Sequence, residues 1–305
     1  MLNVLSVEYI TPILKLRIES MENTSNVQNV VNFLHTKKKK EIICWTQLIL
    51  PISEIWKEDI WSKYLSYAGR LMGAAGYGTI RPSWIDDMRE YFHLPVSLES
   101  LKQLGEKIGL PLHDINTISG QDAFDLAATG QYIFEYVSIN AMRPYVGRYR
   151  LPVIHTGGSA LNVLLNERLR KELGYPVFIP CNPNDCGLAF GYMALRNPPT
   201  KRVDIRYNNF PILDIDRLPE FVEKYNASLV PIKAIARLIC DGNVIGVMRG
   251  NSEVGPRALG NRSIVCLPFI PGIKEKLNEI KSRENWRPFA PAVKIEDAEQ
   301  YFDFT

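Results

Sequence analysis

The sequence lacks paired cysteines, a long apolar run and a strong net charge. It has five cysteines, an odd number, and no two show CxxC spacing, which indicates reduced thiols in a cytoplasmic protein. No apolar run reaches membrane-spanning length, and the first 20 residues carry acids and bases that do not suit a signal peptide. The net charge of +3 gives no general case for a nucleic-acid or membrane partner, so any anion site should be local.

What is present is ordinary globular composition, with 46% hydrophobic and 23% charged residues in 305. That length suits one large domain or two ordinary ones. Residues 1–60 form a poorly defined N-terminal segment, and the basic run Lys37–Lys40 within it favours a solvated loop over a nucleic-acid contact. Residues 61–200 are more regular. A helix is expected from about Ser119 to Met142, with Pro144 expected to stop it.

Residues 151–197 alternate between strand and helix patterns. An apolar strand (151–155) leads into a Gly-Gly loop and an amphipathic helix, and a second strand leads into an acidic turn and another helix. This alternation predicts an α/β domain. Gly157 and Gly158 would let a phosphate approach the helix N-terminus, although tight packing explains most such pairs. His155, at the end of the strand, suits a nucleotide contact and a structural role equally.

Asp185 opens the last of these helices. An N-cap is the default role of an aspartate there, but its place one crossover after the glycines strengthens the case for a ligand site. Two prolines then end the helix, and the polar stretch 201–215 is predicted to link it to a second domain, 216–305.

The second predicted domain carries basic residues on stiff loops. A strand runs into the Gly-Pro-rich loop GPRALGNRS, and a helix leads into the turn WRPFAP. Guanidinium groups held by Gly, Pro and aromatic residues suit bidentate recognition of phosphate or carboxylate better than a solvated face does. Asn278 is expected on the helix surface, and Trp286 and Phe289 are expected to pack and stiffen the turn rather than stack on a base. The basic residues are Arg257, Arg262, Lys274, Lys276, Lys281, Arg283 and Arg287.

Six segments together resemble the O-carbamoyltransferases of the nodulation-factor and antibiotic-biosynthesis type. They follow the family order and span most of residues 61–304. The pair GPRALGNRS and KSRENWRPFAP is highly specific, whereas GGSALN alone is shared with many actin-like ATPases. The segments are GRLMGAAGYG (69–78), DLAATGQYIFE (125–135), HTGGSALN (155–162), NDCGLAFGYMAL (184–195), SEVGPRALGNRSI (252–264) and IKSRENWRPFAP (280–291).

The resemblance implies an α/β fold of two modules, an actin-like ATPase (ASKHA) half-module followed by a partial YrdC-like module. It implies ATP, carbamoyl phosphate, a hydroxyl-bearing acceptor and a divalent metal, Fe or Mg. Carbamoyl adenylate would form in the second module, and the carbamoyl group would pass to the acceptor in the first. The implied catalytic residues are Arg257, Arg262, Lys281 and Arg287, the substrate- and phosphate-binding residues Arg283, Gly255, Asn261 and Ser263, the nucleotide-binding residues Gly157, Gly158 and Asn162, and the metal ligand Asp185.

The chain also departs from the family pattern. Family members are usually nearly twice as long, and their actin-like domain carries a phosphate-binding hairpin and an HxxxH metal pair that this sequence does not show. The four histidines lack that spacing. We therefore expect the second half of one module and the first half of the next. A truncated product, a split-gene subunit and a reduced homologue all fit this expectation, with an N-terminal half polypeptide or a second copy as partner.

Two other functions stay open at this point. A non-catalytic nucleotide-binding subunit fits the missing metal pair but leaves the complete set of cations unexplained. A carbamoyltransferase acting on a nucleic-acid base or a tRNA has only the Lys37–Lys40 run in its favour.

Overall fold

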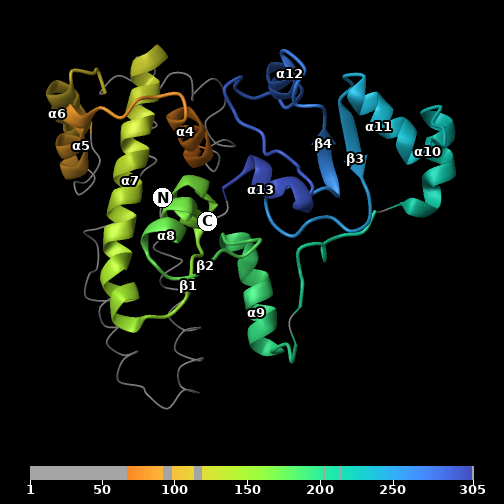
Figure 1. Cartoon of the computed structure of the whole chain (residues 1–305), viewed down its shortest axis with the longest axis horizontal. Coiled ribbons are helices and arrows are strands. Elements are labelled where there is room, and N and C mark those ends of the chain that lie inside the picture. Colours follow the sequence, from red (N-terminus) through yellow and green to blue (C-terminus); the bar gives the residue numbers. More distant parts are fainter. Residues whose placement is uncertain (1–66, 92–97, 113–118, 202, 213, 304–305) are drawn as a thin grey trace. The chain divides into compact units, whose positions relative to one another are not determined.

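The computed structural model describes residues 67–91, 98–112, 119–201, 203–212 and 214–303 (Figure 1). The N-terminal segment 1–60, with its lysine run and Cys44, lies outside these residues. The chain divides into two units. The first comprises residues 1–206 and 254–256, and the second comprises residues 207–253 and 257–305.

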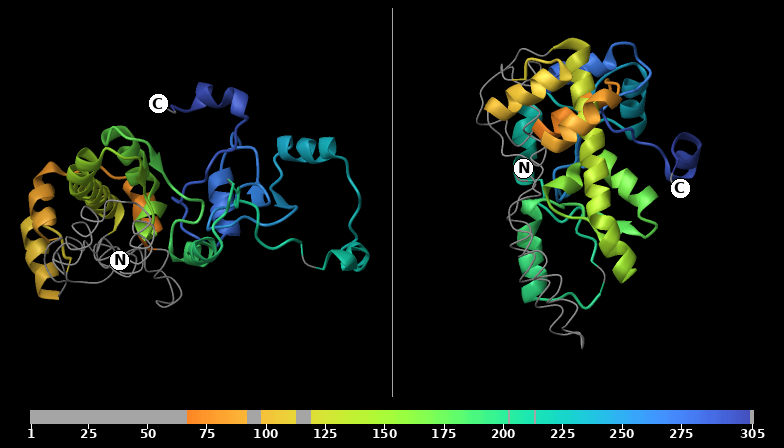
Figure 2. Two further views of the ribbon diagram at one scale, coloured as in Figure 1. Left: turned by 90° about the horizontal axis from the view of Figure 1, so that it is seen from below. Right: turned by 90° about the vertical axis from the view of Figure 1, so that its left-hand side faces the viewer.

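The first unit is built around one long helix, α7 (Gly120–Tyr149). Helix α4 (Tyr67–Ala75) and helix α5 (Ile85–Tyr91) both contact α7, and α6 (Leu98–Ile108) packs on α5 (Figures 1 and 2). A short 3-10 turn, η4 (Pro82–Trp84), precedes α5. Helix α7 is buried on nearly every side from Asp125 to Gln131, as expected for a helix around which others pack. Leu71, Met88, Leu126 and Ile133 are among the apolar side chains that form the core of this unit.

Helix α7 does not stop at Pro144, as the sequence predicted, but continues to Tyr149. A proline inside a helix removes one bond, the one from its own nitrogen to the carbonyl four residues earlier. That carbonyl belongs to Asn140, an exposed residue, so water can satisfy it. The helix ends instead at Arg150, whose left-handed backbone (φ 51°) lets its N–H close on the carbonyl of Val146.

The rest of the first unit alternates between strands and helices in the predicted order. Strand β1 (Val153–Ile154) pairs in parallel with β2 (Val177–Phe178), and each strand has just two residues. Between them lie a 3-10 turn, η5 (Gly158–Leu161), and helix α8 (Val163–Glu172), which packs on α7. After β2 come η6 (Asp185–Gly187) and α9 (Leu188–Arg196). The actin-like assignment of this unit stays a prediction.

The second unit contains the antiparallel pair β3 (Ile245–Met248) and β4 (Arg262–Val265), in which Met248 lies opposite Arg262. The basic Gly-Pro loop joins these two strands. The YrdC-like assignment and the predicted domain limits stay predictions. The other elements are η7 (Ile215–Arg217), α10 (Leu218–Lys224), α11 (Ile232–Cys240), α12 (Ile273–Ile280), η8 (Ile295–Asp297) and α13 (Ala298–Tyr301).

Both units are therefore mixtures of helix and short strand. In the described ranges, no helix combines the length and apolar character needed to cross a bilayer.

Candidate functional site

The loop between β3 and β4 is organised by one carboxylate, that of Glu253. Glu253 is 6% exposed, and its side chain points into the loop that follows it. Its Oε1 accepts hydrogen bonds from three backbone amides, those of Leu259, Asn261 and Arg262, at 2.6, 2.8 and 3.2 Å. Three amide donors on one carboxylate oxygen form a small anion-binding nest, and they restrict the loop backbone to one conformation.

The same contacts decide the protonation of Glu253. Burial by itself disfavours the charged form, but the amide hydrogen bonds to the carboxylate outweigh it and lower the pKa from 4.5 to about 2. Glu253 is therefore ionised throughout the physiological range. The sequence analysis missed this residue, although an acid inside a Gly-Pro-rich loop with no neighbouring base is a signal that could have found it.

Arg262 braces this loop from within. Its guanidinium donates to the carbonyl oxygens of Arg249 at 2.7 Å and Gly250 at 3.2 Å. Asn261 adds a second brace, because its amide donates to the carbonyl of Asn251 and accepts from the Arg249 guanidinium. The hydroxyl of Ser263 accepts from the amide of Gly260. The side chains predicted to bind anion here thus hold the loop, and any additional contact with a ligand stays a prediction.

Arg257 and Gly255 differ in their surroundings. Arg257 is exposed. Gly255 has a φ of 113°, which side chains rarely tolerate, and a Cβ there would lie 2.3 Å from the carbonyl oxygen of Cys181. Backbone conformation and close packing both demand glycine at this position, whether or not a phosphate approaches it.

A second cluster follows α12 and is centred on Asn278. This side chain is fully buried, so the prediction of a helix-surface position is wrong. Its amide nitrogen donates to the carbonyls of Asn285 and Arg287, and its oxygen accepts from Nε of Arg283 at 2.6 Å. Asn278 satisfies backbone groups of a turn that returns to the helix, which apolar periodicity alone does not reveal.

The cations predicted after α12 differ in their surroundings. Arg283 donates to the carbonyl of Pro288 and lies 4.3 Å over the Phe289 ring; burial lowers its pKa, with the nearby charge of Arg287 acting in the same direction. Phe289 therefore helps to stiffen the turn, as predicted. Arg287 forms an ion pair with Glu284 at 3.7 Å. Lys281 is exposed at the C-cap of α12.

The Gly-Gly loop of the first unit follows β1. Gly157 adopts a φ of 91°, and its N–H donates to the carbonyl of Pro183 at 2.6 Å. The hydroxyl of Thr156 donates to the same carbonyl. This loop is thereby held to the turn before Asp185, while a Cβ on Gly158 would meet open space.

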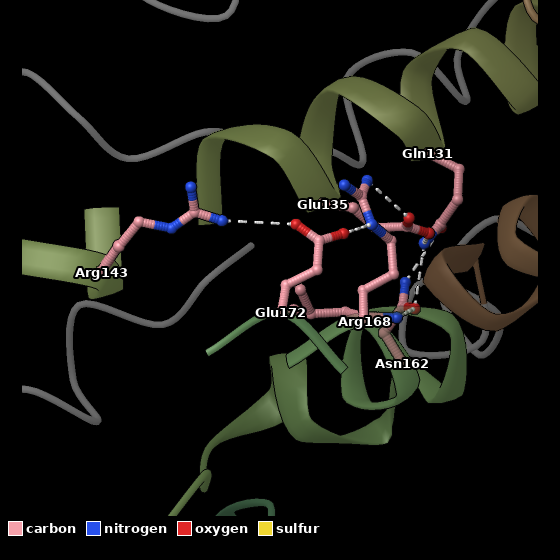
Figure 3. Close-up of polar contacts among 7 residues, drawn as sticks. Gln131, Glu135, Arg143, Asn162, Arg168 and Glu172 are labelled. Carbon is pink, nitrogen blue, oxygen red and sulfur yellow. Dashed lines mark hydrogen bonds and ion pairs between the residues drawn. The ribbon is translucent and has the colours of Figure 1, made fainter. Parts of the chain in front are cut away.

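Asn162 caps α8 and belongs to a polar network between α7 and α8 (Figure 3). Its Oδ1 accepts from the amide of Leu165, and its side chain exchanges two hydrogen bonds with Gln131. The network continues to Glu135 and Arg168, and then to Glu172. The predicted nucleotide contact of Asn162 would have to compete with these bonds, and it stays a prediction.

Asp185 is exposed in the first turn of η6. Within the stretches that the structure describes, no three or more His, Cys, Asp or Glu side chains gather in a way that could hold a metal ion. The described residues therefore do not fit the divalent metal implied by the resemblance.

The comparisons with known proteins agree with the resemblance drawn from the motifs. Residues 236–305 match the family model described as Carbamoyltransferase C-terminus, and this part of the chain contains β3, β4, α12 and most of the basic loops. The predicted relationship to the O-carbamoyltransferases is confirmed.

The relatives extend the match over much of the chain. The nodulation protein NolNO of Sinorhizobium fredii is 32% identical over 272 residues, which are 79% of this chain and 39% of the relative. Nodulation protein U of the same species is 32% identical over 57% of this chain and 32% of its own length. The 3'-hydroxymethylcephem-O-carbamoyltransferase of Streptomyces clavuligerus is 29% identical over 78% of this chain and 46% of its own length. The chain thus spans less than half the length of each of these relatives.

Proposed function

We propose that this chain is part of an O-carbamoyltransferase that moves a carbamoyl group from carbamoyl phosphate to a substrate hydroxyl. The carboxyl-terminal family match and the relatives support carbamoyl transfer in general. The name of the Streptomyces relative specifies a hydroxymethyl acceptor, and an alcohol on a small molecule is the corresponding proposal for this chain.

The loop between β3 and β4 is the observation that carries the proposal. Glu253 and Arg262 brace it from inside, and Arg257 lies exposed within it. A stiff loop with an exposed guanidinium binds a phosphate without a large ordering cost. Arg257 and Lys281 are therefore the cations that we assign to the phosphate, whereas Arg262 and Arg283 keep their loops in place.

In the proposed reaction, water cleaves carbamoyl phosphate into carbamate and phosphate, and the carbamate oxygen attacks the α-phosphorus of ATP to give carbamoyl adenylate and pyrophosphate. The carbamoyl group then passes to the acceptor hydroxyl with release of AMP. Negative charge develops on the leaving phosphate, and the two cations would stabilise it. Because the described residues do not fit a metal ion, we derive no step through one. The remaining parts of the site would come from an N-terminal half polypeptide or from a second copy of the chain.

The test is carbamoyl-phosphate-dependent release of AMP, measured with this chain or with its reconstituted complex. Arg257→Ala and Lys281→Ala should each lower turnover by about 10- to 150-fold, since a hydrogen bond to a charged group contributes about 1.5–3 kcal/mol. Neither should shift the melting temperature much, because both side chains are exposed. Lys294→Ala, which removes an exposed cation outside the two basic clusters, is the matched control. Unchanged turnover in both variants would show that Arg257 and Lys281 do not bind the phosphate and that their charges have only a structural role.

A further inference from the structure

Three side chains around the Gly-Gly loop form an arrangement that carbamoyl-phosphate binding does not use. His155, at the end of β1, is 5% exposed. Its Nε2 lies 3.1 Å from the hydroxyl oxygen of Ser159 in η5, and its Nδ1 lies 2.8 Å from Oδ1 of Asn166 in α8. A serine, an imidazole and an amide are thus connected in line by hydrogen bonds.

The hydrogen bonds also determine which imidazole nitrogen carries the proton. The Nδ2 group of Asn166 donates to the carbonyl of Ala160 at 2.8 Å, which requires Oδ1 to face His155. An oxygen there can only accept, so Nδ1 of His155 carries the hydrogen and Nε2 presents its lone pair. The Ser159 hydroxyl then donates to Nε2. Burial lowers the pKa of His155, which favours the neutral ring with Nε2 unprotonated.

We propose that Ser159 is an activated nucleophile, with His155 as its general base and Asn166 as the residue that orients the base. This is the same division of roles that activates serine in unrelated hydrolases, recognised by geometry rather than by sequence position. Ser159 is half-buried, and the neighbouring Gly158 is exposed, with open space around the position of a Cβ. A carbonyl compound would approach from this side of the loop. Its substrate class is activated esters of carboxylic or carbamic acids.

The proposed acyl transfer needs only Ser159, His155 and the ester, and every proton and bond is accounted for. Oγ of Ser159 attacks the carbonyl carbon while its proton moves to Nε2 of His155, which becomes an imidazolium. The tetrahedral intermediate collapses with cleavage of the bond to the leaving oxygen, and that oxygen takes the proton from Nε2. The products are the acyl ester of Ser159 and a free alcohol, with His155 neutral again.

The experiment uses the full chain and a fluorophosphonate, a probe that phosphonylates activated serines. The P–F bond breaks as the Oγ–P bond forms, and peptide mass spectrometry locates the label. Labelling is expected at Ser159, should be absent in Ser159→Ala, and should be slower by about 100-fold or more in His155→Gln, because general-base help contributes 10²- to 10⁴-fold. Ser138→Ala, which changes a half-buried serine of α7, should label like the wild type.

Variants of the orienting residue keep the test decisive if His155→Gln does not fold. Asn166→Asp retains an oxygen that accepts from Nδ1 and should label at least as fast as the wild type, whereas Asn166→Leu should label slowly. A merely structural hydrogen bond would make both variants less stable and change no labelling rate. The proposal is overturned by a folded chain that does not label at Ser159, by a label elsewhere only, or by equal rates in the two Asn166 variants. None of these outcomes depends on carbamoyl phosphate, so they leave the proposed function untouched.

Discussion

Glu253 shows how one buried carboxylate can shape a loop that is expected to bind an anion. Its carboxylate accepts hydrogen bonds from three amides of the loop backbone and so fixes their positions. Each hydrogen bond to a charged group contributes about 1.5–3 kcal/mol, more than the usual exposed ion pair. The order of the loop backbone therefore depends on the negative charge of Glu253, although the same loop is expected to bind an anionic ligand.

Replacing Glu253 by glutamine should reduce the free energy of unfolding in a pH-dependent way. The folded pKa of about 2 lies below the ordinary value of 4.5, so the ionised carboxylate stabilises the fold fully above pH 4.5. That stabilisation is lost as the pH falls from 4.5 towards 2. Urea unfolding should therefore show a difference between wild type and Glu253→Gln of about 1–3 kcal/mol at pH 6, shrinking below pH 4.5. A difference that stays constant between pH 6 and pH 3 would contradict this role.

At the scale of elements, polar side chains buried at helix faces decide how loops attach. Asn278 of α12 ties down the turn before Pro288, and Asp125 of α7 does the same for the loop after α4. Asp125 accepts from a backbone amide 46 residues earlier in the chain, whereas Asn278 donates to carbonyls seven and nine residues further on. Such positions interrupt the apolar face of a helix without exposing it to water.

The turn after α12 should weaken when Asn278 is replaced by alanine. The change leaves the carbonyls of Asn285 and Arg287 and the Nε of Arg283 without their present partner. We expect a loss of about 2–3 kcal/mol in the free energy of unfolding, measured with urea. Glu279→Ala, at the exposed neighbouring position of the same helix, should change it by less than about 0.5 kcal/mol. Equal effects of the two substitutions would show that the buried amide contributes nothing specific.

The loop after α4 should depend on the charge of Asp125. This carboxylate is 1% exposed; it accepts from the amide of Thr79 and from the side chains of Arg81 and Gln121. Burial opposes its ionisation, but these donors prevail and lower its pKa. Asp125→Asn should cost about 1–3 kcal/mol of unfolding free energy. It should also speed proteolysis near Arg81.

Asp122→Asn is the control, since it changes an exposed acid in the first turn of α7. It should leave both the unfolding free energy and the cleavage pattern close to those of the wild type. If Asp125→Asn behaves like this control, the loop is held by packing alone, as the close approach of Gly78 to the carbonyl of Phe124 would allow.

At the scale of the whole molecule, the second unit exposes much apolar surface. No residue of α10 or α11 is buried, although α11 is amphipathic. Leu229, Ile232 and Tyr225 are each more than 60% exposed. Large apolar side chains exposed this close together in sequence are typical of a surface that meets another part of a protein.

We therefore expect the chain, expressed alone as residues 1–305, to be oligomeric or prone to aggregation and to transfer no carbamoyl group by itself. Light scattering coupled to size exclusion measures the mass, and release of AMP with ATP and carbamoyl phosphate measures the activity. Leu229→Ser combined with Ile232→Ser should shift the mass towards the monomer, while Lys233→Ser, an exposed neighbour, should not. A monodisperse monomer that turns over many times would contradict the expectation of an incomplete site.

The sequence by itself determined the alternation of strand and helix over residues 151–197, the family relationship and the segments that carry the basic loops. Those properties depend on apolar spacing, on glycine and proline, and on motifs that are contiguous along the chain.

Side-chain partners were decided only by the tertiary structure. Arg262 looked like a ligand for phosphate yet donates to carbonyls of its own loop, and Asn278 looked solvated yet is fully buried. The hydrogen bonds that join Ser159, His155 and Asn166 could not be predicted either, because they form only when the fold brings η5, the end of β1 and α8 together. Hydrogen-bond partners follow the path of the folded backbone, and periodicity along the sequence carries no information about that path.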